Sequence, residues 1–332
     1  MKPHSISVRK LGATGPTVFP FALGCMGMSG MYGPADETES IATIHEALDR
    51  GVTLLDTGDF YGCGHNEMLI GRALKGRRRE QVLLSVKFGA MRAPGGGWGP
   101  YDARPAAVKN FLAYSLVRLG VDYLDIYRPA RFDPAVPIED TIGAIAELVK
   151  AGYVRHIGLS EVGAETIRRA HAVHPIVDLQ IEYSLISRGP ERAIFPVLDE
   201  LDIAVTAYGV LSRGLLSGSR PAAANDFRAY LPRFAGNNAA QNERAIAALA
   251  RIAAEMGVTP SQLAIAWALA KNPRVVPVVG ARKRTQLAES LAAVSLQLSP
   301  GDIARIEAVL PPSAVVGERY GAQQMAVLDS EK

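Results

Sequence analysis

Short apolar runs alternate along this chain with segments in which apolar residues recur every three or four positions. In one such segment Ile41, Ile44 and Leu48 fall on a single helical face, and Gly51 ends it before the next apolar run. Asp36 and Glu39 are spaced as a capping box at its start. We predict strands in the apolar runs, which are residues 21–24, 52–56, 82–87, 121–127, 153–160, 176–181, 203–208 and 274–280.

Eight strands separated mostly by single helices predict parallel pairing through right-handed crossovers. The fold we expect is therefore α/β, a (β/α)₈ TIM barrel. A doubly wound sheet is the competing architecture, but no G-x-G-x-x-G follows a predicted strand. No linker rich in Pro, Ser or Gly divides the chain, so we expect residues 1–332 to form a single domain. Residues 217–240 lack periodicity and are predicted to be a loop over the barrel mouth, the end at which the strands finish.

Three residues at or just after the ends of two successive predicted strands indicate a catalytic site. Asp56 ends one run, Tyr61 follows it, and Lys87 ends the next run. Singly, each has an ordinary structural explanation, as a turn residue, a surface phenol or a solvated amine. Together they can hold a phenol as a proton donor, because a buried ammonium lowers the pKa of the phenol and a carboxylate keeps that ammonium charged. Reduction of a carbonyl by hydride needs such a donor.

Composition and charge indicate the class of protein, its partners and its location. The chain has 332 residues, of which 48% are hydrophobic and 21% charged, and this is typical of a globular protein with a large core. A net charge of +3 gives no reason to expect nucleic acid or an anionic membrane as partner. Two cysteines, Cys25 and Cys63, are too few for a disulfide framework. With no apolar leader and no long apolar stretch, we expect a cytoplasmic protein.

Long motifs carry a family resemblance from about residue 8 to residue 320. They include LGATGPTVFPFALGCMGMS, GVTLLDTGDFYGCGHNEMLIGRAL, LVKAGYVRHIGLSEV, LQIEYSLISR, TAYGVLSRGLLSG, TPSQLAIAWALA and VVPVVGARKRTQLAESL. The chain resembles the aldo-keto reductase family. The resemblance implies a barrel that binds NADPH in an extended form without a Rossmann domain, and a small-molecule carbonyl substrate.

Residue roles follow from the resemblance by position. Tyr61 would be the proton donor, tuned by Asp56 and Lys87, and Tyr208 would stack on the nicotinamide ring. The nicotinamide carboxamide would be bound by Ser160, Gln180 and Glu161, where the family more often has Asn. The other expected cofactor residues are Gly24, Met26, Asp56, Val210, Leu211, Arg213, Gly214, Gly280, Arg282, Arg284, Gln286, Glu289 and Ser290. The expected substrate pocket consists of Met28, Tyr61, Trp98, Ala130 and Arg131.

Arginines at the predicted adenosine end favour NADPH over NADH. Arg282 and Arg284 can offer planar, charge-assisted hydrogen bonds to a 2′-phosphate. The alternative is a solvated helix start, but cations near a helix N-terminus are disfavoured unless an anion compensates them.

One position departs from the family pattern. Family members usually carry a His in a stretch like DLYQLHRVD, and here DIYRPARFD places Ala130 at that position. Losing such a hydrogen-bond donor to a developing oxyanion costs other enzymes about 10²–10³ in rate. Three explanations stay open. Arg128, Arg131 or a water supplies the bond; the cavity admits a bulkier substrate; or catalysis is weak.

Other functions remain as alternatives. The chain could be an NADP-binding regulatory or redox-sensing barrel with residual catalysis, which Ala130 favours and the retained Asp56, Tyr61 and Lys87 oppose. It could also be an isomerase or aldolase that uses Lys87 as a Schiff-base amine. His171 and His174 have no convergent carboxylate or thiol, so we expect no metal. The substrate, the preferred direction and the oligomeric state are not predicted.

Overall fold

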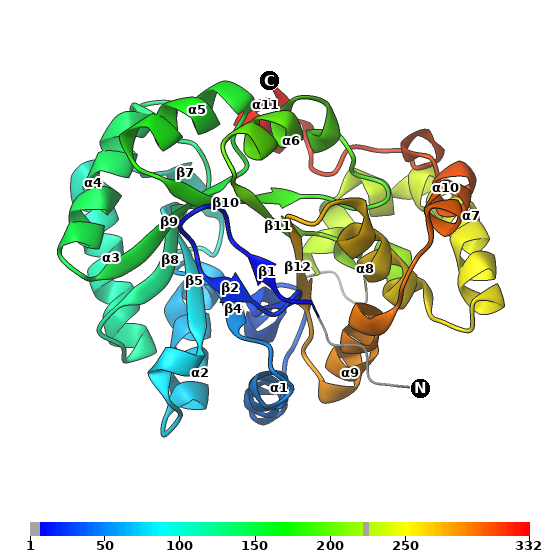
Figure 1. The fold of residues 1–332 in the computed structure, drawn as a ribbon, viewed down its shortest axis with the longest axis horizontal. Helices are drawn as coiled ribbons and strands as arrows, with labels where there is room; N and C mark the ends of the chain where they lie inside the picture. The colour runs from blue at the N-terminus through cyan, green and yellow to red at the C-terminus, as the bar shows by residue number, and fades with distance from the viewer. Residues whose placement is uncertain (1–6, 222–225) are drawn as a thin grey trace.

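A closed barrel of eight parallel strands forms the centre of the protein (Figure 1). The computed structural model describes residues 7–221 and 226–332. In their order around the barrel the strands are β10 (Ile176–Glu182), β11 (Ala204–Tyr208), β12 (Val275–Gly280), β3 (Ala22–Gly24), β4 (Leu54–Gly58), β5 (Leu83–Phe88), β8 (Leu124–Pro129) and β9 (Val154–Ser160). The predicted (β/α)₈ barrel is confirmed, and each strand lies within a few residues of its predicted bounds.

Helices surround the barrel and connect its strands. They are α1 (Glu37–Asp49), α2 (His65–Leu74), α3 (Pro105–Leu119), α4 (Ile138–Lys150), α5 (Ala164–Val173), α6 (Pro190–Glu200), α7 (Gly236–Glu255), α8 (Pro260–Lys271), α9 (Arg284–Ala292), α10 (Pro300–Val309) and the short α11 (Ala322–Ala326). Helix α9 packs beside α1, which completes the ring, and α7 and α10 lie against each other on one flank (Figure 1). No helix among the described residues is long and apolar enough to cross a membrane.

Local sequence signals set several helix ends. Asp36 Oδ1 accepts a hydrogen bond from Glu39 N at 2.7 Å and caps α1. The expected capping box is only half formed, because the Glu39 carboxylate pairs with Arg284 instead. Gly120 ends α3 with φ of +67°, a left-handed conformation that glycine adopts without a Cβ penalty.

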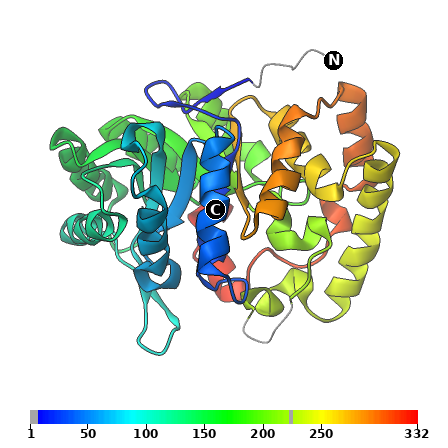
Figure 2. The ribbon, with the colours of Figure 1, turned by 90° about the horizontal axis from the view of Figure 1, so that it is seen from below.

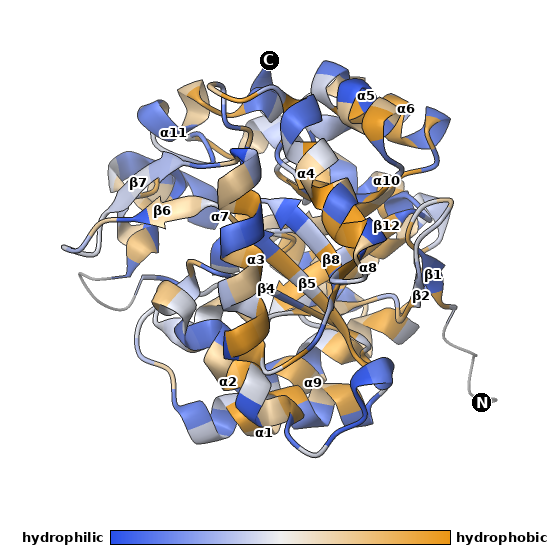
Figure 3. Ribbon diagram, turned by 90° about the vertical axis from the view of Figure 1, so that its left-hand side faces the viewer, coloured by the Kyte–Doolittle hydropathy of each residue, from blue (hydrophilic) through white to orange (hydrophobic). Residues whose placement is uncertain are grey.

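Apolar side chains fill two regions. The larger core lies between the strands and the helices, whose hydrophobic faces point inward and whose outer faces are hydrophilic (Figure 3). A smaller core fills the amino-terminal part of the barrel interior, where Leu54, Ile126 and Val276 pack with Leu11 and Val18. Each large side chain that is fully buried contributes about 1.5–3 kcal/mol.

The two ends of the barrel carry different segments. A hairpin of β1 (Arg9–Lys10) and β2 (Thr17–Val18) covers the amino-terminal end. At the opposite end, the mouth, a second hairpin of β6 (Ala90–Arg92) and β7 (Trp98–Tyr101) and the C-terminal segment project beyond the strands (Figure 2).

The predicted mouth loop 217–240 is partly wrong. Two short 3₁₀ helices span Phe227–Tyr230 and Pro232–Phe234, and α7 already begins at Gly236. The start of α7 has no side-chain cap, so the sequence carried no start signal there. Residues 222–225 of the predicted loop lie outside the described residues.

Candidate active site

A buried ion pair joins two of the predicted catalytic residues at the barrel mouth. Strands β4 and β5 are neighbours, and their register places Lys87 beside Gly58, two residues after Asp56. Lys87 Nζ lies 2.6 Å from Asp56 Oδ1, and both side chains are buried. The other oxygen of Asp56, Oδ2, accepts hydrogen bonds from Ser85 Oγ at 3.0 Å and from Gln180 Nε2 at 2.7 Å. The carboxylate is therefore fixed by three donors.

Tyr61 lies against this pair. It begins the 3₁₀ helix Tyr61–Gly64 just beyond β4, and only 7% of it is exposed. Lys87 Nζ is 5.2 Å from the centre of its ring. The structure thus brings Asp56, Tyr61 and Lys87 together.

The pKa of the Tyr61 phenol is raised in this structure, opposite to the lowering expected from Lys87. Burial raises the pKa of Tyr61 well above its usual value, and the Asp56 charge raises it further. Burial also lowers the pKa of Lys87, although Asp56 opposes this shift. Burial and the Asp56 charge thus both favour the protonated phenol.

Residues with a strained backbone are concentrated around the barrel mouth. Among the described residues, five non-glycine residues have positive φ, and four of them follow the carboxyl ends of barrel strands: Cys63, Glu161, Ser212 and Arg213. Such conformations cost about 1–3 kcal/mol each and persist where the surroundings enforce them, as they do at functional sites.

All three predicted carboxamide-binding residues already have protein partners. Gln180 donates to Asp56, and Glu161 is fully buried in an ion pair with Arg319, at 2.6 Å between Glu161 Oε2 and Arg319 Nη2. Burial alone would raise the pKa of Glu161, but the Arg319 charge holds it at about 2. The third residue, Ser160, has its hydroxyl 3.4 Å from Arg131 Nη1. Glu161 is thus an anchor for the C-terminal segment.

The segment from Val210 to Gly214, predicted to line the diphosphate, has the strained backbone. Ser212 has φ of +46° and Arg213 φ of +56°. Arg213 pairs with buried Glu182 at 2.7 Å, and Arg228 Nη1 donates to Arg213 O at 3.0 Å. Contacts of both its side chain and its carbonyl oxygen therefore hold Arg213 in the left-handed conformation.

Three guanidinium groups surround the buried carboxylate of Glu182. Arg233 and Arg319 approach its carboxylate at 3.5 Å and 3.7 Å, besides Arg213. These three charges lower the pKa of Glu182 although burial opposes them. Arg319 also pairs with Glu161 and Glu331, so carboxylates balance the guanidinium groups in this cluster.

The arginines predicted to bind the adenosine end of the cofactor also contact other parts of the protein. Arg282 Nη1 donates to the carbonyl oxygens of Tyr32 and Pro34, both at 3.0 Å. Arg284, at the N-terminus of α9, pairs with Glu39 at 3.0 Å and is exposed. A phosphate at this end would take the place of the Glu39 carboxylate.

The remaining residues of the predicted adenosine end are placed as follows. Gln286 Oε1 accepts from Arg282 N, Glu289 accepts from Thr259, and Ser290 is buried. Gly280 is exposed at the end of β12, where it pairs with Gly24, and Gly24 pairs in turn with Asp56.

The expected substrate residues separate into two groups. Ala130 and Arg131 lie at the end of β8 and Trp98 on the β6–β7 hairpin, where its ring contacts Phe60, the neighbour of Tyr61, at 5.7 Å between centroids. Met28 is instead fully buried in the apolar core.

Arg128 cannot replace the missing imidazole. Its guanidinium points into the barrel, where it pairs with Asp178 at 2.9 Å and donates to Ser85 at 3.0 Å. A Cβ on Gly158 would lie 2.6 Å from Asp178 Oδ1 and 2.9 Å from Arg128 Cζ, so this ion pair needs glycine there.

No sequence pattern marks the C-terminal segment, residues 311–332, as part of the site. Its Arg319 and Tyr320 are both buried at the mouth, and Tyr320 Oη lies 2.8 Å from Tyr208 Oη. The segment has no hydrophobic periodicity. Glu161 was the one residue that could have predicted its role. A carboxylate in place of Asn inside a barrel mouth requires a cation partner, and Arg319 of this segment is that partner.

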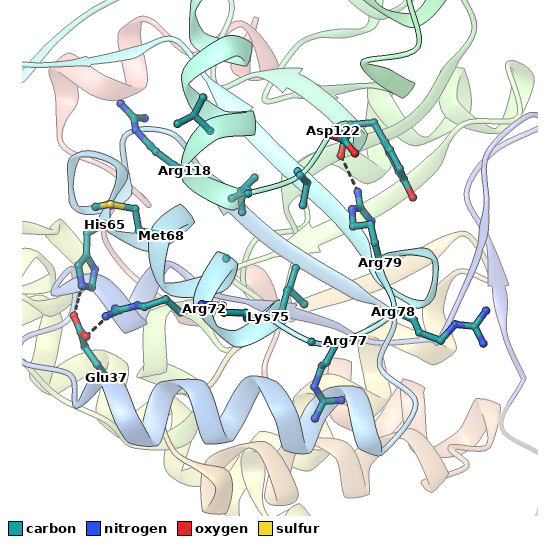
Figure 4. A pocket seen from close by; sticks show the side chains of 18 residues that line it. Glu37, His65, Met68, Arg72, Lys75, Arg77, Arg78, Arg79, Arg118 and Asp122 are labelled. Carbon is teal, nitrogen blue, oxygen red and sulfur yellow. Dashed lines mark hydrogen bonds and ion pairs between the residues drawn. The ribbon is translucent and has the colours of Figure 1, made fainter.

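A surface groove of about 810 Å³ between α2 and α3 lies away from this chemistry (Figure 4). Its cations are largely paired, for example Arg72 with Glu37 at 2.7 Å and Arg79 with Asp125 at 2.7 Å. None of the three predicted catalytic residues lines it.

Known proteins with similar sequences and folds identify the family of this chain. The model of the aldo/keto reductase family matches residues 20–311. The chain belongs to the aldo/keto reductase family. A probable aldo-keto reductase of Glycine max is 38% identical over 324 residues, which cover 96% of this chain and 93% of that protein.

Solved structures agree with the family. A glycerol dehydrogenase from Gluconobacter oxydans has a TM-score of 0.82 at 27% identity and covers 93% of this chain and 97% of its own. An aldo-keto reductase from Bacillus halodurans in its holo form has a TM-score of 0.77 at 30% identity, with 95% and 99% covered. A thermostable aldo-keto reductase in complex with the inhibitor epalrestat has a TM-score of 0.74 at 29% identity, with 91% and 99% covered. The protein is thus an oxidoreductase of small carbonyl compounds, in a family that uses NAD(P)H.

Proposed function

We propose that this protein is an NADPH-dependent reductase of aldehydes or ketones in which Tyr61 donates the proton. The observation that carries the proposal is the buried cluster at the ends of β4 and β5. Lys87 and Asp56 are paired at 2.6 Å, and the Tyr61 ring lies 5.2 Å from the same ammonium. This arrangement suits a general acid, because it keeps a phenol dry, protonated and close to a fixed positive charge.

The roles of the three residues follow from their charges. NADPH, when bound, would supply hydride to the carbonyl carbon. The carbonyl oxygen then gains an electron pair and takes the proton of Tyr61, which gives the alcohol and leaves a phenolate. Lys87 stabilises that phenolate, and Asp56 keeps the ammonium charged and in place. Water returns a proton to Tyr61, and the same residues serve alcohol oxidation in the reverse direction.

The residues present fit such a cofactor. The left-handed backbone at Ser212 and Arg213 favours a diphosphate at the end of β11, where the Arg213 guanidinium pairs with Glu182. Arg282 and Arg284, near the N-terminus of α9, favour a 2′-phosphate and hence NADPH over NADH.

The central test is Tyr61→Phe. We expect loss of measurable turnover across a panel of aldehydes and ketones, while NADPH affinity measured by fluorescence quenching stays within a few-fold. A suitable control is Tyr114→Phe, because Tyr114 is 54% exposed on α3. Wild-type rates in Tyr61→Phe on a good substrate would refute the role of this phenol.

A further inference from the structure

Ala130 leaves a position at the mouth without a side-chain donor. Its methyl group is buried at the end of β8, and its carbonyl oxygen accepts a hydrogen bond from Arg131 Nη1 at 2.7 Å. Arg128 is turned into the barrel toward Asp178. The donor that completes the site must therefore come from another element.

The second phenol at the mouth, Tyr320, is well placed for this role. It comes from the C-terminal segment, and only 8% of it is exposed. Its hydroxyl lies 2.8 Å from Tyr208 Oη and accepts from Arg131 Nη2 at 3.3 Å. Tyr320 thus contacts both the predicted nicotinamide platform, Tyr208, and the residue after Ala130.

Hydrogen-bond directions make Tyr320 a donor at the mouth. Tyr208 donates its own proton to Glu161 Oε1 at 2.8 Å, and Arg131 donates to the Tyr320 oxygen. Tyr320 therefore donates the 2.8 Å hydrogen bond to the Tyr208 oxygen, and it would have to turn this proton toward a substrate oxygen placed beside it. The Arg213 guanidinium lies over the Tyr320 ring at 4.5 Å, and its charge makes the hydroxyl a stronger donor.

Several charged contacts hold Tyr320 in place. The preceding residue, Arg319, forms two hydrogen bonds to Glu161, at 2.9 Å and 2.6 Å, and pairs with Glu331 at 2.7 Å. Asp329 Oδ2 accepts from Gly163 N at 2.7 Å. A donor fixed in this way needs little reorganisation during the reaction.

We propose that Tyr320, polarised by Arg131, supplies the second hydrogen bond to the substrate's carbonyl oxygen and so replaces the imidazole that Ala130 lacks. Tyr61 transfers the proton, and Tyr320 keeps its own while it stabilises the charge that develops on the oxygen. This inference rests on the proposed reductase function, and it makes the C-terminal segment part of the catalytic site.

The first experiment removes one oxygen atom, with Tyr320→Phe. We expect kcat/KM for a small aldehyde to fall by about 10²-fold, as when one oxyanion donor is lost, with NADPH affinity within twofold of wild type. Binding of benzoate, a carboxylate that mimics the charged oxygen, to the NADP complex should weaken by about tenfold in calorimetry. Tyr153→Phe, in a tyrosine that is 49% exposed, is the matched control.

The second experiment returns the imidazole. Ala130→His should restore most of the rate lost in Tyr320→Phe. An unchanged rate in Tyr320→Phe beside an inactive Tyr61→Phe would overturn the role of Tyr320 and leave the reductase function standing. A Tyr320→Phe variant that loses NADPH affinity but keeps kcat would also overturn it, because Tyr320 would then be a cofactor contact. Full activity in Tyr61→Phe would instead defeat the proposed function.

Discussion

Glu161 and Arg319 form a two-pronged ion pair that joins the end of β9 to the C-terminal segment. Arg319 Nη1 and Nη2 donate to Glu161 Oε1 and Oε2 at 2.9 Å and 2.6 Å, and the two residues are 158 positions apart in the sequence. The pair seats Tyr320 beside Tyr208. The C-terminal segment therefore lines the candidate active site.

Breaking this pair should release the segment. In Arg319→Met, Glu161 would remain buried without its main cation, and an uncompensated buried charge costs about 3–5 kcal/mol. We expect residues 318–331 to exchange their amide hydrogens much faster, as measured by mass spectrometry. Arg305→Met removes a surface ion pair with Glu255 and should leave that segment unchanged. Wild-type protection of residues 318–331 in Arg319→Met would show that other contacts hold the segment.

The buried carboxyl of Asp59 should make stability depend on pH. Burial raises its pKa from 3.8 to about 7, and the nearby Glu67 charge adds to the effect. The unfolded chain then loses this proton at lower pH than the folded protein does. The group therefore destabilises the fold progressively as pH rises from 3.8 to about 7, by up to about 4 kcal/mol.

Asp59→Asn removes that penalty. We expect the variant to be more stable than wild type at pH 8 and close to wild type at pH 4, measured by urea unfolding. The exposed Glu147, paired with Lys109, provides the control Glu147→Gln, which should show little change at either pH. A stability difference in Asp59→Asn that is equal at both pH values would contradict the raised pKa.

Arg284 should distinguish the two dinucleotides. Arg284→Ala would remove the proposed charge-assisted contact to a 2′-phosphate, so NADPH affinity should fall roughly tenfold while NADH affinity barely changes. Glu39→Gln should act in the opposite direction, because Glu39 now pairs with Arg284 at 3.0 Å. Equal losses for NADPH and NADH in Arg284→Ala, measured by fluorescence titration, would place the phosphate elsewhere.

The Arg128–Asp178 pair inside the barrel should be more costly to break than to replace. Both side chains are fully buried, and Asp178 Oδ1 and Arg128 Nε lack a hydrogen-bond partner among the described residues. We expect Arg128→Met alone to destabilise the protein by about 3–5 kcal/mol, and the double variant Arg128→Met with Asp178→Leu to recover most of that loss. Denaturant unfolding measures both. A double variant as unstable as the single one would indicate that the pair contributes net stability.

The sequence by itself determined the barrel and the location of its chemistry. Apolar runs that alternate with helical stripes predict eight parallel strands, and the carboxyl ends of such strands must meet at one face. Asp56 and Lys87 end adjacent strands, so their closeness followed from local pattern and topology alone. Tyr61 follows from the same rule, because it begins the loop next to Asp56.

Tertiary structure alone decided which charges pair. The ion pairs Glu161–Arg319 and Glu39–Arg284 join residues from distant segments, and no periodicity in the sequence encodes them. The pKa of Tyr61 also depended on the fold, because burial and the Asp56 charge raise it. Hydrophobic periodicity records which face of an element is buried. Hydrogen bonds and ion pairs depend on distances of about 3 Å between side chains, and only the packed chain fixes those distances.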